Sequence, residues 1–538
     1  MKGGIFIFNE FLCISACIVL VCVIMVKFGS RIGVPSLILF IGFGMIFGSD
    51  GIFKIHFDDF VLSEKICTVS LIYIMFYGGF CMNWESAKKV ALKAGILSTI
   101  GIILTTAFVG LFAHYMLKMT LLEGLLIGAV LASTDAASVF NILRMKKLNL
   151  KEGMAPLLEM ESGSNDPFAY MLTVIILSFM SASSFSALEL ILRQIGFGVG
   201  FGFLCGYVGY QLSKKLNFKD MGRQTVYIVG IALLSYALPC VLQGNGFLSV
   251  YITGMILGNA SLSKKVEIVH FFDTISQMMQ MVLFFLLGLL AFPSQIPQII
   301  PTAFLIMIFL TFIARPLTVW LCMFPFSMSF KEIIFLSWSG LRGAASIVFA
   351  IMTVVSPAYT DHDIFHIVFF VALLSITIQG SFLPKVARIL GIEDQTNNTM
   401  KTFTDYIENK PLELVEIEMD ETHPWSNHKL EDVTMASNML IVGIQRNSQI
   451  FYPKGDTMIL PNDLLIVCCC AYQGEDIYLE ELYIKNKHPW IGKTMQDINE
   501  HQRFLVTMIK RHEHLVVPKG DTQIEAEDIL VYLDRKKV

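Results

Sequence analysis

Charged residues are scarce in this chain of 538 residues. Asp, Glu, Lys and Arg make up 16% of it, whereas they make up about 25% of an ordinary soluble protein. The shortage is uneven, because residues 1–395 carry 25 Lys or Arg and 21 Asp or Glu, and the remaining 143 carry 15 and 23. The composition argues against a wholly soluble protein and predicts a membrane part followed by an acidic soluble part.

Motifs for metal, disulfide and nucleotide chemistry are missing as well. The eleven cysteines form no C-x-x-C pair and no Cys/His metal spacing, so neither a disulfide framework nor a zinc site is supported. No G-x-G-x-x-G occurs outside the apolar segments, and NAD is therefore not expected. No nucleophile–base set or phosphate loop indicates an enzyme, and we expect no nucleic-acid partner.

Long apolar runs are abundant instead. A helix needs about 20 mostly apolar residues to cross a bilayer. Such runs predict a polytopic α-helical membrane protein with thirteen spans, at 5–27, 32–49, 64–82, 90–116, 121–143, 157–180, 188–212, 223–243, 246–262, 275–292, 298–325, 331–356 and 363–387. The first run is too long for a signal peptide and lacks a basic flank and a cleavage site, so we expect it to be retained.

Basic residues fall on alternate connections between these spans. They are Lys27 and Arg31; Lys88, Lys89 and Lys93; Arg144, Lys146, Lys147 and Lys151; Lys214, Lys215, Lys219 and Arg223; Lys264 and Lys265; Lys331; and Lys385 and Arg388. Because cytoplasmic loops collect Lys and Arg, the pattern predicts an N-terminus outside the cell membrane and a C-terminus in the cytoplasm.

The soluble part contains one sequence twice, at an offset of 65 residues. His423-Pro424-Trp425 recurs as His488-Pro489-Trp490, Pro453–Thr457 (PKGDT) recurs as Pro518–Thr522, and Asp463 recurs as Asp528. Self-similarity at a fixed offset indicates a repeated structural unit. Each copy is expected to contain a strand, a short amphipathic helix and further strands around P-K-G-D-T, where glycine supplies a positive φ.

These observations predict the domain boundaries. A transmembrane domain covers 1–392, a linker covers 393–410, and two small α+β domains cover 411–472 and 473–538. Because domains of about 60 residues are marginally stable alone, we expect the two copies to pack against each other and across a homodimer.

The repeat resembles the C-terminal ligand-binding subdomain of the regulators of potassium conductance, known as the TrkA-C or RCK_C type. The matching features are the helix start after Pro-Trp, the P-x-G-D-T turn and the strand after an acidic residue. The resemblance implies dimerisation and, as in several potassium transporters, regulation by cyclic di-AMP. A dimerising module without a ligand is the alternative, and no other cofactor is expected.

Three predicted spans carry charged residues in their interior, where each costs roughly 2.5–3.5 kcal/mol to insert. They contain Ala132–Ala136 (ASTDA), Glu159–Pro167 (EMESGSNDP) and Ser339–Ser346 (SGLRGAAS). Ser162, Asn165 and Asp166 lie three or four residues apart and share one helix face. The neighbouring glycines and hydroxyls can interrupt a helix and free carbonyl groups for a cation.

Oxygen ligands of this kind suit alkali cations and protons. Loss of water makes a carboxylate hold a proton more tightly, so a cation and a proton would compete for Asp166, and that competition is by itself an exchange mechanism. The alternative for Glu161 and Arg342 is a purely structural ion pair. For Arg315 we expect a structural role, with a side chain that reaches the membrane interface.

Thr134-Asp135, Glu161-Ser162-x-x-Asn165-Asp166 and Gly340–Ala344 (GLRGA) resemble the signature residues of the NhaP-like monovalent cation:proton antiporters of the CPA1 type. The resemblance covers residues 1 to about 390 and implies two inverted repeats with broken crossing helices. It implies that Asp166 binds the alkali cation or the proton, with Ser162 and Thr134 as further ligands, and that Asn165 orients the crossing. Asp135 would neutralise helix ends, and Glu161 would pair with Arg342.

One position departs from the family pattern. Relatives carry an acidic residue before two glycines in the third span, where this chain has Tyr77 before Gly78-Gly79. The loss of that charge and the potassium-type repeat favour exchange of potassium for protons, electroneutral because Asn165 replaces the aspartate of electrogenic relatives. A sodium/proton antiporter is the nearest alternative.

Two other classes of membrane protein agree less well with the sequence. A ligand-gated cation channel would need a filter like T-V-G-Y-G, and Gly206–Gly209 (GYVG) lies inside a continuous apolar span. A membrane-bound signalling receptor would use the repeat but leave the acidic residues inside the spans unexplained.

Overall fold

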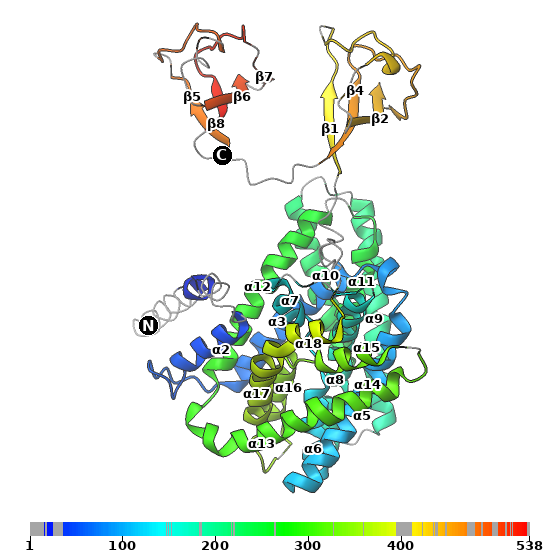
Figure 1. Ribbon diagram of the computed structural model, residues 1–538, viewed down its shortest axis with the longest axis vertical. Helices are drawn as coiled ribbons and strands as arrows, with labels where there is room; N and C mark the ends of the chain where they lie inside the picture. Colours follow the sequence, from blue (N-terminus) through cyan, green and yellow to red (C-terminus); the bar gives the residue numbers. More distant parts are fainter. Residues whose placement is uncertain are drawn as a thin grey trace. The chain divides into compact units, whose positions relative to one another are not determined.

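The chain forms two units in the computed structural model, Met1–Asn409 and Lys410–Val538 (Figure 1). The structure describes residues 16, 19–24, 36–146, 148, 150–151, 153–181, 186–216, 218, 221–262, 265–326, 328–358, 360–393, 412–421, 423–433, 435, 439–446, 449–470, 479–485, 488–495, 497, 504–511, 514–516, 518 and 520–534. Most of the first predicted span and nearly all of the linker 393–410 lie outside the described residues.

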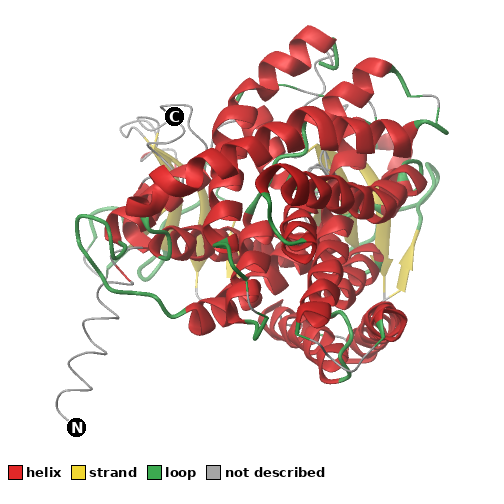
Figure 2. Ribbon diagram, turned by 90° about the horizontal axis from the view of Figure 1, so that it is seen from below, coloured by secondary structure: helices red, strands yellow, loops and turns green. Residues whose placement is uncertain are grey.

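The first unit is helical; Figure 2 draws helices in red and the strands, which belong to the second unit, in yellow. Its helices are α2 (Ser36–Phe47), α3 (Phe60–Cys81), α4 (Trp84–Ala87), α5 (Ala91–Leu117), α6 (Leu121–Ala132), α7 (Ala136–Met145), α8 (Met154–Met180), α9 (Ala187–Leu216), α10 (Met221–Val241), α11 (Gly246–Asn259), α12 (Lys265–Leu289), α13 (Ile296–Phe309), α14 (Arg315–Met323), α15 (Phe330–Trp338), α16 (Ala344–Val355), α17 (Ile364–Leu374) and α18 (Gly380–Leu390). Short turns join some of them: η1 (Pro293–Gln295) is 3₁₀, and η2 (Leu310–Ala314) and η3 (Ser375–Gln379) are π-helical.

Each of the twelve predicted spans after the first coincides with a helix or a run of helices in the described part of the chain. Seven described helices are long and apolar enough to cross a membrane alone, and the pair α6–α7, bent by 43°, adds an eighth. The prediction was wrong about the start of α12, which begins ten residues before 275. Glu267 and Asp273 lower the hydropathy of its first turns and hid them.

The described helices pack as two groups. One contains α5–α8 and α13–α18, and the other contains α2, α3 and α9–α12. The first group has two sets of three spans in which the middle span is broken, in the order that the inverted repeats predict. The two groups meet where α3 packs on α16 and α8 on α11.

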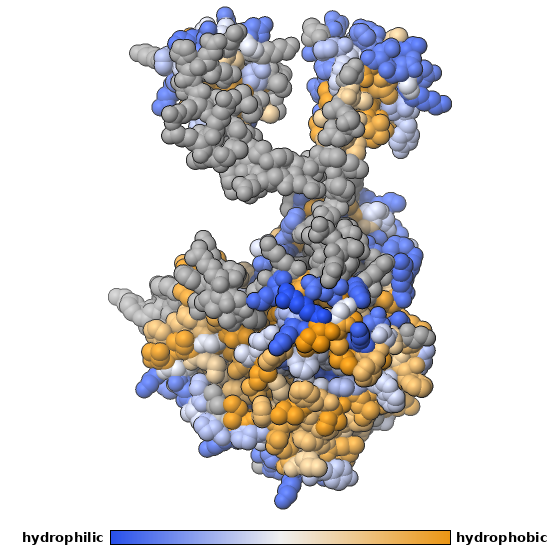
Figure 3. Space-filling model, in the orientation of Figure 1, coloured by the Kyte–Doolittle hydropathy of each residue, from blue (hydrophilic) through white to orange (hydrophobic). Residues whose placement is uncertain are grey.

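Glycine allows the closest helix contact in the second group. A Cβ at Gly258 of α11 would lie 1.9 Å from the carbonyl oxygen of Phe80 in α3. Small residues at such crossings let backbones approach closely, which is the usual basis of packing between helices in membranes. Apolar side chains cover much of the visible face of this unit (Figure 3).

The second unit contains two four-stranded antiparallel sheets of the same topology, ordered β1-β4-β2-β3 and β5-β8-β6-β7. The strands are β1 (Leu412–Glu418), β2 (Met439–Arg446), β3 (Gln449–Phe451), β4 (Leu464–Cys470), β5 (Leu479–Tyr483), β6 (Phe504–Arg511), β7 (His514–Val516) and β8 (Ile529–Asp534). β2 and β6 carry the same bulge, between Ile441 and Gly443 and between Val506 and Met508. The copies at an offset of 65 residues are therefore two copies of one fold.

Two details of the predicted repeat are wrong. Gly455 does not have a positive φ, because Thr457 closes the P-K-G-D-T turn: its N–H donates to Lys454 O and its Oγ1 accepts the Lys454 N–H. The positive φ values occur at equivalent pairs elsewhere, Asn427 with Gly492 and Asn462 with Glu527. Among the described residues of the first copy, the predicted amphipathic helix is only the 3₁₀ turn η4 (Leu430–Asp432).

Candidate functional site

Two broken helices cross in the first unit. The first break, residues 133–135, separates α6 from α7, and the second break, residues 339–343, separates α15 from α16. The backbone N–H of Asp135 donates to the carbonyl oxygen of Leu341 at 2.8 Å and joins the breaks directly. Broken crossing helices were predicted, and they expose backbone groups inside the bundle as they do in transporters.

Asp135 lies at two helix N-termini. Its carboxylate accepts the N–H and the hydroxyl of Ser138 in the first turn of α7, at 3.1 and 2.5 Å. It also lies beside the start of α16, because a Cβ at Gly343 would be 2.3 Å from Oδ2 of Asp135. A carboxylate in this position offsets the partial positive charge of both helix ends.

Arg342 lies at a helix C-terminus. Its Nη1 donates to the carbonyl oxygens of Ala132 and Ser133, each at 2.9 Å, where α6 ends. The residue is buried, and its charge offsets the partial negative end of α6. The second break therefore places the positive charge of Arg342 at the first break.

The predicted pair of Glu161 with Arg342 is wrong. Glu161 instead accepts a charged hydrogen bond from Nη2 of Arg315, and both side chains are buried. Arg315 therefore does not extend to the membrane interface as expected. It directly follows the π turn η2, and Gly340 leaves room for it, since a Cβ there would lie 2.8 Å from Nε of Arg315.

Asp166 and the other predicted site residues converge on the first break. Ser162 Oγ donates to the carbonyl oxygen of Thr134 at 2.8 Å and accepts the Ala136 N–H at 3.0 Å. Asn165 Nδ2 donates to Thr134 Oγ1 at 2.5 Å. These contacts arise because Ser162, Asn165 and Asp166 share one face of α8, as the sequence spacing indicated.

Sequence reasoning missed the role of Ser133, whose hydroxyl donates to Oδ1 of Asp166. Its position directly before Thr134 in the break was the available signal. Asp166 itself is half-buried, and the Oδ1 of Asn165 is buried without a hydrogen-bond donor in the described structure. The arrangement offers one carboxylate and several neutral oxygens, which suits a small hard cation.

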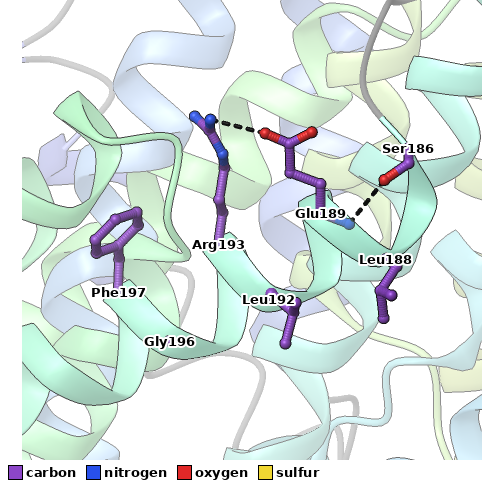
Figure 4. A pocket seen from close by; sticks show the side chains of 7 residues that line it. All are labelled: Ser186, Leu188, Glu189, Leu192, Arg193, Gly196 and Phe197. Carbon is purple, nitrogen blue, oxygen red and sulfur yellow. Dashed lines mark hydrogen bonds and ion pairs between the residues drawn. The ribbon is translucent and has the colours of Figure 1, made fainter.

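A surface groove on α9 does not form part of this arrangement. It has a volume of about 460 Å³ and is lined by Ser186, Leu188, Glu189, Leu192, Arg193, Gly196 and Phe197 (Figure 4). Arg193 pairs with Glu189 at 2.8 Å and donates to Gln243 at 3.1 Å. Because its charges are matched to one another, the groove does not offer the oxygen ligand set that the crossing does.

A bundle in which two broken helices cross beside a carboxylate defines a secondary membrane transporter. Residues 16–388 match the model of the transmembrane sodium/hydrogen exchanger family, and residues 414–470 and 479–531 each match the TrkA-C domain. The chain belongs to the sodium/hydrogen exchanger family, a family of multi-pass transporters. The resemblance inferred from the motifs is thereby confirmed for both parts.

Named relatives extend over most of the chain. The K(+)/H(+) antiporter NhaP of Alkalimonas amylolytica is 32% identical over 85% of this chain and 81% of its own length. The K(+)/H(+) antiporter NhaP2 of Shewanella baltica is 31% identical over 88% of this chain and 82% of its own length.

A solved structure shares the fold of the helical unit. The sodium proton antiporter MjNhaP1 of Methanocaldococcus jannaschii, at pH 8, aligns with a TM-score of 0.63 and 24% identity. The alignment covers 70% of this chain and 97% of that one. At this identity the likeness concerns the fold alone.

Proposed function

We propose that this chain is a potassium/proton antiporter that exports potassium in exchange for protons, with Asp166 as the group that binds either one. The observation that carries the proposal is the uncompensated charge of Asp166. Among the described residues no ion pair includes its carboxylate, since Arg342 is committed to two carbonyl groups and Arg315 to Glu161. A partly buried carboxylate without an ion-pair partner favours a bound proton or cation.

Neutral oxygens around Asp166 complete the proposed cation site. Thr134, Ser162 and Asn165 lie within one hydrogen-bonded cluster, and the Ser133 hydroxyl contacts the carboxylate. A cation would occupy the position where Asn165 Oδ1 lacks a donor. With Asp166 as the one exchangeable carboxylate, one monovalent cation replaces one proton, so the exchange is electroneutral.

Potassium is favoured over sodium by two observations. Two relatives that this chain matches over most of their length are named K(+)/H(+) antiporters. In addition, Tyr77 stands where an acidic ligand would strengthen the field for the smaller ion. Sodium/proton exchange is the second candidate, because the same carboxylate and hydroxyl oxygens also suit sodium.

Everted membrane vesicles with a quenched pH-sensitive dye test the function. Potassium added to vesicles with the intact chain should restore fluorescence, more strongly than equal sodium. Asp166→Asn removes the exchangeable charge and should abolish the response. Asp58→Asn, at an exposed loop position, is the matched control and should respond as the unaltered chain does. Exchange that persists in Asp166→Asn would overturn the assignment of the carboxylate.

We also propose an orientation with the N-terminus outside and the repeat in the cytoplasm, supported by the basic residues on alternate connections. A cysteine-reactive reagent that cannot cross membranes should label Asp58→Cys more than the unaltered chain in intact cells, and equally in everted vesicles. Labelling of that variant only in everted vesicles would reverse the orientation.

Regulation by cyclic di-AMP and homodimerisation through the TrkA-C domains are proposed on the basis of those domains. Exposed apolar residues on one face of the first sheet, among them Leu440 and Ile450, support a surface that packs on another domain. The solubilised chain should run as a dimer and unfold at a higher temperature with cyclic di-AMP. An unchanged unfolding temperature at saturating nucleotide would remove the ligand from the proposal.

A further inference from the structure

Two π-helical turns lie in the spans on either side of the second broken helix. η2 interrupts the run α13–α14, and η3 interrupts the run α17–α18. They contact each other through Thr311 Oγ1 in η2, which donates to Oε1 of Gln379 in η3 at 3.3 Å. Single π turns within α-helices are rare and occur frequently at functional sites, so their joint position beside the break calls for a physical account.

Gln379 binds the end of α15 in both directions. Its side-chain Nε2 donates to the backbone carbonyl oxygen of Trp338 at 2.6 Å, and the backbone carbonyl oxygen of Gln379 accepts the indole N–H of Trp338 at 3.1 Å. Trp338 is the last residue of α15, where carbonyl groups lose their helical partners. The amide orientation is determined by chemistry, because the Trp338 carbonyl can only accept.

Ser375 connects the same π turn to the arginine of the break. Its Oγ donates to Oε1 of Gln379 at 3.0 Å and accepts the backbone N–H of Arg342 at 3.2 Å. Gln379 and Ser375 are both buried. The turn η3 therefore binds the break 339–343 at its first flank, Trp338, and within it, at Arg342.

The contacts continue from Arg342 to the proposed site. Arg342 Nη1 donates to the carbonyl oxygen of Ser133, and the hydroxyl of Ser133 donates to Asp166. A shift of the second break would therefore move the arginine, the end of α6 and the hydroxyl on the carboxylate together.

We propose that Gln379 and Ser375 are positioning residues for the exchange reaction. They hold the second break at the depth at which Arg342 binds the end of α6, and this sets the geometry of Ser133 and Asp166 and hence the affinity for the cation. Neither residue contacts Asp166. The inference rests on the proposed function for its effect on transport, but its structural part, the anchoring of the break, is independent of the substrate.

The test compares Gln379→Met, Ser375→Ala and Thr377→Val in the same vesicles. Thr377 lies in the same π turn, but its exposed hydroxyl bonds only to the Leu373 carbonyl of its own helix, which makes Thr377→Val the matched control. Loss of buried hydrogen bonds should raise the KM for potassium roughly fivefold in Gln379→Met and shift the pH profile of exchange, with a smaller change in the maximal rate. Ser375→Ala should change KM in the same direction, and the double variant should be non-additive.

Hydrogen–deuterium exchange in the solubilised chain gives a second readout that needs no transport. The amides of residues 339–343 should exchange faster in Gln379→Met than in Thr377→Val. The positioning role alone would be overturned if Gln379→Met left the KM, the pH profile and the amide exchange unchanged while the unaltered chain transported potassium. If the unaltered chain moves no cation, the proposed function fails, and the amide-exchange comparison still decides whether Gln379 anchors the break.

Discussion

The two breaks at the helix crossing differ in length, charge and surroundings. The first has three residues and carries Asp135, and the second has five and carries Arg342. Each supplies the charge that the other lacks, since Asp135 lies at the start of α16 and Arg342 at the end of α6. Each break therefore places a charged side chain at a helix end that belongs to the other break. Neither break could offset the partial charges of its own helix ends alone.

The surroundings of the breaks also differ. The first break contacts α8 and Asp166, whereas the second contacts the π turn η3. Under the proposed function, the first break serves the substrate and the second break supports the first. Removal of a side chain from either break should therefore affect transport, but for different reasons.

The largest effect is expected when the second break loses the positive charge of Arg342. Arg342→Met removes the charged donor from the buried carbonyl groups of Ala132 and Ser133 and leaves Ser133 only the Ser346 hydroxyl at 3.5 Å. The loss costs about 1–3 kcal/mol for each carbonyl. Potassium-dependent dequenching should disappear, and the solubilised chain should unfold at a lower temperature. Wild-type exchange by a folded Arg342→Met chain would contradict the crosswise assignment.

A smaller effect should identify the true partner of Glu161. Arg315→Met leaves Glu161 buried without its cation, and we expect a loss of about 3 kcal/mol. Adding Glu161→Met should restore most of that loss, because an apolar pair of similar size replaces a buried ion pair at little cost. Thermal unfolding of the single and double variants measures the coupling. Recovery by Glu161→Met in an Arg342→Met background instead would support the rejected pairing.

The two TrkA-C domains offer a second comparison of equivalent sites. In each copy an arginine at the end of a strand binds a buried aspartate, Arg446 with Asp463 and Arg511 with Asp528, at 2.7 and 2.8 Å. Around this shared pair the copies differ. Arg446 lies over the ring of Phe451, whereas Arg511 also pairs with Glu525.

The smallest expected effect is a pH dependence of the first copy. Burial alone would raise the pKa of Asp463, but hydrogen bonds from Arg446 and the Leu460 N–H, with the charge of Arg446, hold that pKa below the usual 3.8. A group whose pKa is lower in the folded state than in the unfolded state stabilises the fold at pH values above the unfolded pKa. That stabilisation is lost as the pH falls through the folded pKa. Unfolding of a fragment from residue 411 should therefore become easier below about pH 4. Asp463→Asn should remove about 1 kcal/mol or more together with this pH dependence, and an unchanged dependence would contradict it.

Much of the architecture could be predicted from the sequence. Apolar runs located every span after the first that the structure describes, because length and hydropathy alone decide whether a helix can cross a bilayer. The offset of 65 residues predicted two copies of one fold, and the helical spacing of Ser162, Asn165 and Asp166 predicted their common face. These are local properties, or properties of one helix.

The partners of the buried charges could not be predicted in the same way. Glu161 had two arginines available, and the choice of Arg315 depends on the π turn before it and the space at Gly340. The hydrogen bond between Gln379 and Trp338 joins residues 41 positions apart and follows no motif. Likewise, Thr457 and not glycine determines the P-K-G-D-T turn, through a hydrogen bond between side chain and backbone.

The sequence by itself determined where the chain crosses the membrane, where its helices break, which residues carry charge inside the bundle and that the soluble part is duplicated. Each of these follows from hydropathy, spacing or identity along the chain. Only the tertiary structure decided which charge meets which partner and which turn supports which break. Those choices depend on the rotation and depth of one helix against another, which packing sets over distances that no sequence pattern records.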